Sequence, residues 1–146
     1  MGTANRTRIS RDVYLELVRA HDRFSAEFTS LFREHGISSP QYNVLRILAG
    51  GPEEGTSCHA IRERLLTRVP DVTRLVDRMV ASGIVHRERD PDDRRIVRVR
   101  ITPAGRRLLR RLARPVDDLH ARQFARIPVR DLAALRDALR SLQEQA

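Results

Sequence analysis

The sequence predicts a mainly α-helical fold that carries one small β-hairpin, and three patterns support this prediction. Apolar residues recur at helical spacing along most of the chain. Two short segments, 84–89 and 96–102, have the composition of strands. The six residues between them, five charged residues and one proline, suit an exposed turn. Low-complexity tracts, long linkers and internal repeats are absent from the sequence, so we expect one domain over residues 1–146.

The composition suits a soluble protein with a basic surface. Of its 146 residues, 40% are hydrophobic and 32% are charged, and all 28 basic residues are arginine. The net charge is zero over residues 1–56, +4 over 57–102 and +5 over 103–146. Such a distribution fits a nucleic-acid partner, and it equally fits a solvated arginine-rich surface. With no signal peptide and no apolar run of roughly 20 residues, we expect a cytoplasmic protein without a membrane partner.

Two helices are expected in the first third of the chain. Ser10 can cap a helix that runs to Gly36. Its apolar stripe consists of Val13, Leu17, Phe24, Phe28, Leu31 and Phe32. Ser38 and Gln41 then form a capping box for a second helix that reaches about Leu48.

A loop over residues 50–55 separates these helices from two more. Ser57 can cap a short helix from Cys58 to about Leu66, and a further helix begins at Pro70 and ends near Gly83. The residues expected to face inward are Ile61, Leu65, Leu66, Val72, Leu75, Val76, Met79 and Val80. The opposite face of the second helix is polar throughout and carries Asp71, Thr73, Arg74, Asp77 and Arg78.

This order predicts a helix-turn-helix, whose second helix enters the major groove of DNA. Arg74 and Arg78 lie four residues apart on the polar face, where each guanidinium could bind a guanine edge. Thr73 could contact a thymine methyl group or a phosphate. Free N–H groups in the first turn, near Pro70 and Asp71, could hold a phosphate. Taken alone, this helix is more typical of an ordinary solvated surface.

The hairpin favours the DNA interpretation. Its turn carries Arg94 and Arg95, which could lie against phosphates or enter a narrow minor groove. We expect Asp92, Asp93 or both to orient these arginines or to bind N–H groups of the turn. A polar-faced helix followed by an arginine-tipped hairpin predicts a winged helix-turn-helix over residues 37–102.

The terminal segments, 1–36 and 103–146, are expected to form a dimer interface. Thr102 and Pro103 begin a long helix that Pro115 should bend or interrupt. Its apolar residues are Leu108, Leu109, Leu112, Val116 and Leu119. The last helix, from Val129 to Gln143, carries Leu132, Leu135, Leu139 and Leu142. This leucine stripe and the three phenylalanines of the first helix exceed what one thin chain should bury, so a second copy is expected to cover them, with Val13 and Leu17 at the interface. The alternative is that both stripes pack into the core of their own chain.

Catalytic and metal-binding motifs are absent from the sequence, so we expect no enzyme, no cofactor and no metal. Cys58 lies near a helix N-terminus and could sense oxidants, although a small structural thiol is the simpler interpretation. His21 beside Phe24 and Phe28 could line an effector pocket or could be an interface histidine.

Residues 72–109, together with SPQYNVLRIL at 39–48, resemble the MarR family of bacterial transcription regulators. The segments Asp93-Arg94-Arg95 and Ile101-Thr102-Pro103-Ala104-Gly105 match its hairpin signature. The resemblance implies an obligate dimer held by the terminal helices. It implies recognition of duplex DNA around Asp71, Thr73, Arg74 and Arg78, with Arg95 in the minor groove. It also implies release of DNA when a small molecule binds between the dimer helices and the DNA-binding part. We expect a repressor on an inverted repeat; the alternative is a helical protein-interaction module whose winged helix does not bind DNA.

Overall fold

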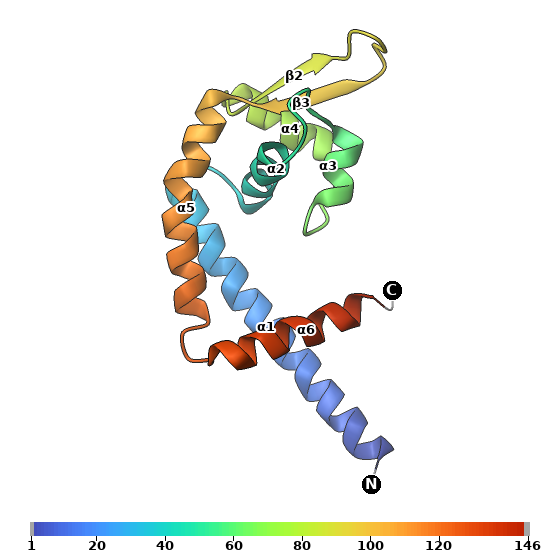
Figure 1. Ribbon diagram of the computed structural model, residues 1–146, viewed down its shortest axis with the longest axis vertical. Coiled ribbons are helices and arrows are strands. Elements are labelled where there is room, and N and C mark those ends of the chain that lie inside the picture. Colours follow the sequence, from blue (N-terminus) through green and yellow to red (C-terminus); the bar gives the residue numbers. More distant parts are fainter. Residues whose placement is uncertain (1, 145–146) are drawn as a thin grey trace.

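The computed structural model describes residues 2–144 and contains, in that range, six helices and a three-stranded antiparallel sheet (Figure 1). The elements are α1 (Thr3–Glu34), α2 (Ser39–Ala49), β1 (Thr56–Ser57), α3 (Cys58–Arg64), α4 (Val72–Ala81), β2 (Val85–Arg89), β3 (Val97–Ile101), α5 (Pro103–Gln123) and α6 (Val129–Gln143). A compact head holds α2, α3, α4 and the sheet, and the long helices α1 and α5 lead away from it. The predicted fold class, mainly α-helical with a small hairpin, is confirmed.

Helix α1 begins at Thr3, so the prediction that Ser10 caps it is wrong. Residues 3–9 include neither glycine nor proline, so nothing prevents the helix from beginning before Ser10. The Thr7 hydroxyl donates to the Thr3 carbonyl within the helix (2.9 Å). The expected end is confirmed, because Gly36 adopts φ +75° directly after the last turn.

The capping box of α2 is confirmed. The Ser38 hydroxyl accepts from the Gln41 N–H at 3.3 Å, and the Gln41 side chain accepts from the Ser38 N–H at 3.0 Å. Val44, Leu45 and Leu48 are buried, so α2 forms the centre of the head.

Helix α3 is shorter than predicted. It ends at Arg64, and Leu65 is already extended (φ −62°, ψ 136°), so the chain leaves the helical period before Leu66. Leu66 is therefore 87% exposed and not inward-facing as expected. Its N–H donates to the Asn43 side chain of α2 (2.9 Å), which fixes the segment between α3 and α4 to α2.

Helix α4 begins at Val72, two residues later than predicted, because the Asp71 carboxylate caps it by accepting from the Arg74 N–H (3.0 Å). Four of the five expected inward residues are buried: Val72, Leu75, Val76 and Met79. Val80 is 36% exposed, because it lies at the edge of the apolar stripe in the last turn.

The sheet has the strand order β1-β3-β2, and β1 was not predicted. With only two residues, β1 has no periodic pattern of its own, and it pairs with β3 through Thr56 and Val99. Gly55, with φ +100°, makes this pairing possible because a Cβ atom there would lie 2.8 Å from the Val99 carbonyl oxygen. The predicted hairpin of β2 and β3 is confirmed, with Val99 fully buried.

The three phenylalanines of α1 pack against their own chain. Phe32 is 3% exposed and stacks on Tyr42 of α2 (centroids 4.4 Å apart), while Phe24 meets Phe124 edge to face (5.1 Å). Phe28 contacts Phe32 and His120. The expectation that a second copy covers this stripe is therefore wrong for Phe32, which its own chain buries. Phe24 and Phe28 are half-buried, so for them it stays a prediction.

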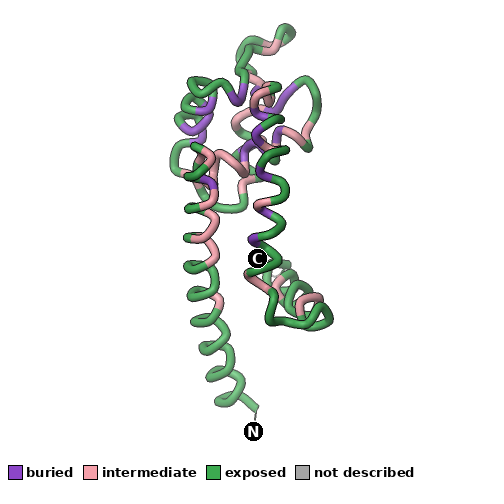
Figure 2. Tube along the Cα trace, turned by 90° about the vertical axis from the view of Figure 1, so that its left-hand side faces the viewer, coloured by how far each residue is buried: buried purple, intermediate pink, exposed green. Residues whose placement is uncertain are grey.

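Helix α5 begins at the predicted cap, where the Thr102 hydroxyl accepts from the Gly105 N–H (3.1 Å). It continues through Pro115 to Gln123, so the expected interruption does not occur. The carbonyl that loses its partner to Pro115 belongs to Arg111, an exposed residue. In Figure 2 the buried residues gather in the head and along α5, whereas residues 3–16 of α1 are all exposed. Among the helices described, none combines the length and apolarity that crossing a membrane requires.

Candidate nucleic-acid interface

The outward face of α4 consists of polar side chains on a firmly packed helix. Asp71, Thr73, Arg74, Asp77 and Arg78 are all exposed, directly opposite the buried stripe of the helix. Arg74 and Arg78 form no ion pair with any residue between 2 and 144. Their guanidinium groups are therefore available to a ligand outside the chain.

Two acidic residues of this face are engaged within the chain. Asp71 caps α4, so the Arg74 N–H that could have held a phosphate is occupied, and Pro70 lies outside the helix. Asp77 forms an ion pair with Arg87 of β2. This pair joins α4 to the hairpin and fixes their relative position.

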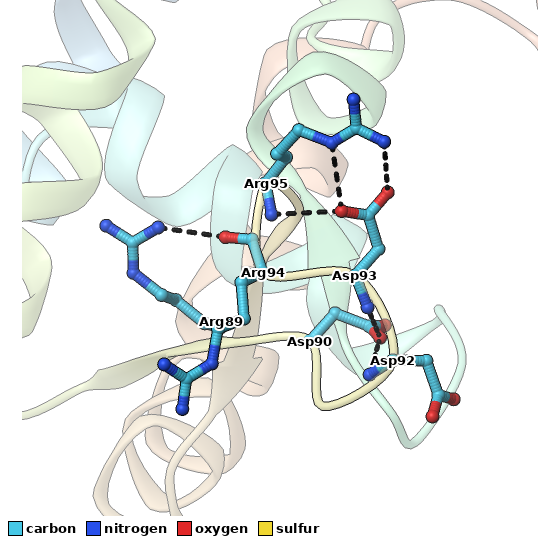
Figure 3. Close-up of polar contacts among 6 residues, drawn as sticks. All are labelled: Arg89, Asp90, Asp92, Asp93, Arg94 and Arg95. Atoms are coloured by element: carbon cyan, nitrogen blue, oxygen red, sulfur yellow. Dashed lines mark hydrogen bonds and ion pairs between the residues drawn. The ribbon is translucent and has the colours of Figure 1, made fainter.

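The hairpin turn presents Arg95 in a defined orientation (Figure 3). The Asp93 carboxylate accepts from the Arg95 backbone N–H (3.1 Å), from its Nε (3.2 Å) and from its Nη2 (3.4 Å). The Arg95 side chain is nevertheless 92% exposed. Asp93 thus holds one edge of the Arg95 guanidinium, through Nε and Nη2, while the rest of the side chain stays open to solvent. The Asp92 side chain forms no hydrogen bond or ion pair within the described part of the chain.

Asp90 organises the turn, a role that sequence reasoning missed. Its carboxylate accepts from the backbone N–H groups of Asp92 (2.9 Å) and Asp93 (3.1 Å) and from Nε of Arg98 in β3 (2.6 Å). The Arg98 hydrogen bond, followed by the two backbone bonds, lowers the pKa of Asp90 below its usual value. The Arg98 contact spans eight residues and reaches diagonally across the hairpin, where Arg98 is paired with Glu88, so only the strand register could have indicated it.

A concavity of about 840 Å³ lies between the start of α3, Thr73 of α4 and the hairpin. It is lined by Ser57, Cys58, His59, Thr73, Arg87, Glu88, Arg89, Arg95, Ile96 and Val97. Three of these residues are arginines. Nη1 of Arg89 donates to the Arg94 carbonyl (2.8 Å) and so stabilises the turn. Arg87 and Arg89 lie two residues apart on β2 and therefore on the same face of the strand, so period-two spacing in the sequence could have indicated them.

A second cavity, of about 950 Å³, lies where α1, α2 and α5 meet. His21, Phe24 and Phe28 line it, as do Phe32 and Tyr42. The remaining lining residues are Ser25, Thr29, Ser39, Pro40, Asn43, Arg46, Leu66, Thr67, Ala113, Val116, Asp117 and His120. Burial raises the pKa of the Tyr42 phenol, so its hydroxyl stays protonated. The cavity therefore has aromatic walls, several hydrogen-bonding groups and one arginine.

The terminal helices leave apolar side chains uncovered. Val13 is 49% exposed on α1, and Leu135 and Leu142 are 38% and 62% exposed on α6. Leu17, Leu132 and Leu139 are half-buried. No residue of α6 is buried, which is unusual for a helix with a leucine stripe.

Cys58 lies half-buried at the start of α3. Burial raises the pKa of its thiol, and the nearby Arg87 and Arg62 offset this only in part. A group of three or more residues able to hold a metal ion does not occur within residues 2–144.

Comparisons with known proteins agree with this geometry. A family model described as MarR family matches residues 35–96. The crystal structure of a MarR transcription factor from Planctomyces limnophilus is 38% identical in sequence, with a TM-score of 0.72, and the match covers 93% of this chain and 96% of that one. The PcaV transcriptional regulator from Streptomyces coelicolor, solved in complex with its natural ligand, is 26% identical with a TM-score of 0.72, covering 90% and 89%.

A curated relative, the HTH-type transcriptional repressor IacR from Pseudomonas putida, is 29% identical over 108 residues. The match covers 74% of this chain, and the chain spans 64% of the length of that relative. The family model covers the chain from α2 through β2 and the hairpin turn, and the Planctomyces structure extends the likeness to nearly the whole chain. The chain therefore belongs to the MarR family of winged helix-turn-helix transcription regulators.

Proposed function

We propose that this protein binds duplex DNA as a homodimer and represses transcription by occupying an inverted-repeat operator. The observation that carries the proposal is that Thr73 of α4 and Arg95 of the hairpin line one concavity. A helix with a polar outer face can enter the major groove, and a basic hairpin beside it can reach the flanking minor groove. Classification of the Pseudomonas relative as a repressor supports the proposed sign of regulation.

The residues divide into those that contact DNA and those that position the contacts. Arg74 and Arg78 lie one turn apart and can each bind a guanine edge through two hydrogen bonds, while Thr73 can contact a thymine methyl group or a phosphate. Arg94 and Arg95 would contact the minor groove and its phosphates. The acidic residues have positioning roles: Asp71 caps the helix, Asp77 joins it to β2, and Asp93 orients the hairpin arginine.

The dimer would form through the uncovered apolar side chains of the terminal helices. Val13 and Leu17 of α1 and Leu142 of α6 surround one hollow, which a second copy could fill. Leu132, Leu135 and Leu139 would extend the same interface along α6. A two-fold axis there would place two copies of α4 about one DNA turn apart (~34 Å), which matches an inverted repeat.

The aromatic cavity would hold a small-molecule effector. His21, Phe24 and Phe28 form one wall, and Leu66 and Thr67 of the segment that leads to α4 form another. An occupant would therefore contact both the terminal helices and the segment that positions α4. The ligand-bound PcaV structure supports such regulation. The aromatic walls and Arg46 favour a small aromatic acid.

Fluorescence anisotropy on duplex DNA from the region upstream of the gene tests the proposal. We expect wild-type binding that weakens strongly with added salt, because phosphate contacts release counterions. Arg95→Ala should weaken binding to all sequences, whereas Arg74→Ala should also lower the preference for operator over random DNA by about 1–3 kcal/mol at one base pair. Equal losses on operator and random DNA for Arg74→Ala would contradict its role, and no binding at low salt would contradict the function.

A further inference from the structure

Helix α5 carries a dense group of arginines that the proposed DNA contacts do not use. We define the arginine face as the residues Arg106, Arg107, Arg110, Arg111 and Arg114. All five are exposed, and they lie on the side of α5 opposite its buried residues, Leu108, Leu112 and Val116. The buried side of α5 packs on α1, α2 and β3, so the arginine face points away from the chain's own core.

The arginine face is electrostatically unfavourable for the isolated chain. In the described part of the chain, its single ion pair is a long one, between Arg114 and Asp118 (3.9 Å), with the arginine side chain 91% exposed. Several of the arginines are spaced three or four residues apart, which makes like charges neighbours on the helix surface. Arg106 and Arg107 also lie near the N-terminus of α5, where the helix dipole disfavours cations, and the first turn has no acidic residue.

Other helices of the chain place acidic residues among their arginines. Arg19, Arg23 and Arg136 on α1 and α6 each pair with an acidic residue of the same helix, at 2.7, 3.1 and 3.0 Å. Residues 103–116 of α5, by contrast, include five arginines and no acidic residue. The uncompensated charge of the arginine face therefore suits a polyanion outside the chain.

The arginine face begins where α4 ends. The Thr102 hydroxyl, at the cap of α5, donates to the carbonyl of Gly83, two residues after the end of α4 (2.7 Å). From there α5 runs down one edge of the molecule, away from the hairpin (Figure 1). Arg106 to Arg114 span about 12 Å along the helix axis, a length over which one DNA strand presents about three or four phosphates.

We propose that the arginine face binds the phosphate backbone of DNA that flanks the operator, bent toward α5. The proposal rests on the proposed function, since it requires a duplex that α4 and the hairpin already hold and whose flanking part bends to reach α5. Phosphates are the chemistry that matches a row of guanidinium groups without acidic neighbours. An acidic protein surface is the competing partner, and the experiment below separates the two.

Affinity for two DNA lengths tests the inference. The short duplex carries the footprint found upstream of the gene, about two helical turns, and the long duplex adds about two turns on each side. Arg107→Gln/Arg111→Gln removes two charges and keeps a good helix former at both positions. Arg122→Gln/Arg126→Gln removes the same charge beyond the arginine face and is the matched control.

We expect the wild type and the control to bind the long duplex at least ~10-fold more tightly than the short one. The Arg107/Arg111 variant should lose this gain and keep its affinity for the short duplex. On the long duplex, the slope of log affinity against log salt concentration should become shallower by about 2 per subunit. Its thermal stability should not fall, because the change relieves repulsion between like charges. If the wild type gains nothing from the flanks, or the variant gains as much as the wild type, flanking DNA is not the partner and an acidic protein surface becomes the better explanation.

If the variant loses affinity equally on both lengths, the arginine face does not act through the flanks and the inference is also overturned. A wild type that binds neither duplex would overturn the proposed function itself. Binding to the short duplex separates the two failures. If the wild type binds the short duplex, only the inference can have failed; if it binds neither duplex, the proposed function and the inference fail together.

Discussion

Gly105 provides a sharp test of how α5 holds the hairpin in place. This residue lies in the first turn of α5, against the start of β2. In Gly105→Ala, the added Cβ atom would lie 2.8 Å from Cγ1 of Ile101 and closer still to the carbonyl oxygen of Ile84. Both neighbours are held by the sheet, so the helix must move away from it.

The expected destabilisation follows from two effects. Overpacking a filled site costs about 1–3 kcal/mol. Moving α5 also strains the hydrogen bond that the Thr102 N–H donates to the Ile84 carbonyl (3.1 Å), which contributes about 1 kcal/mol. We therefore expect the free energy of unfolding to fall by about 2–4 kcal/mol, and the Tm by roughly 6–15 °C.

Urea unfolding followed by circular dichroism would measure this change. Gly50→Ala is the matched control, because its backbone (φ −92°, ψ −2°) suits alanine and the added Cβ atom would meet only the Arg46 carbonyl, at 3.6 Å. We expect the control to be as stable as the wild type or slightly more so. Equal stability of the two variants would refute the packing argument.

Three further predictions concern the hairpin, the dimer and the thiol. Because the pKa of Asp90 lies below its usual value, its bonds to the turn should persist above about pH 4 and weaken as the pH falls through the lowered pKa. Amide exchange at Asp92 and Asp93 measures this, and protection that stays constant as the pH falls, or that is unchanged in Asp90→Ala, would be evidence against it. Val13→Glu should convert the dimer to monomer in analytical ultracentrifugation, and a dimer that survives would exclude Val13 from the interface. Cys58 should react with a disulfide reagent more slowly than free cysteine at pH 7, because burial raises its pKa; rapid reaction would revive an oxidant-sensing role.

Local signals in the sequence predicted much of the fold. Features formed by residues only two or three positions apart could be predicted from the sequence. These are the capping box at Ser38, the turn at residues 90–95 and the Thr102 cap. The polar face of α4 was predicted for the same reason, since helical periodicity places Arg74 and Arg78 together.

The missed features depend on distant parts of the chain. The strand β1 exists because β3 supplies its hydrogen bonds, and Asp90 acts through an arginine on the opposite strand. Phe32 of α1 was assigned to a second copy because the packing of α1 against α2 and α5 is a tertiary arrangement that periodicity does not contain. Leu66 was assigned to the core because the early end of α3 depends on Asn43 of α2.

The central claim is that α4 and the hairpin contact adjacent grooves of one duplex. Site-directed DNA cleavage can test it. Cys58→Ser removes the chain's one cysteine, so a DNA-cleaving iron chelate can be attached at Thr73→Cys or, separately, at Arg95→Cys. We predict cuts centred in a major groove from the first site and in the neighbouring minor groove, about half a turn away, from the second. Cuts from both sites at the same base pairs, or none from Arg95→Cys on DNA that the protein still binds, would contradict the claim.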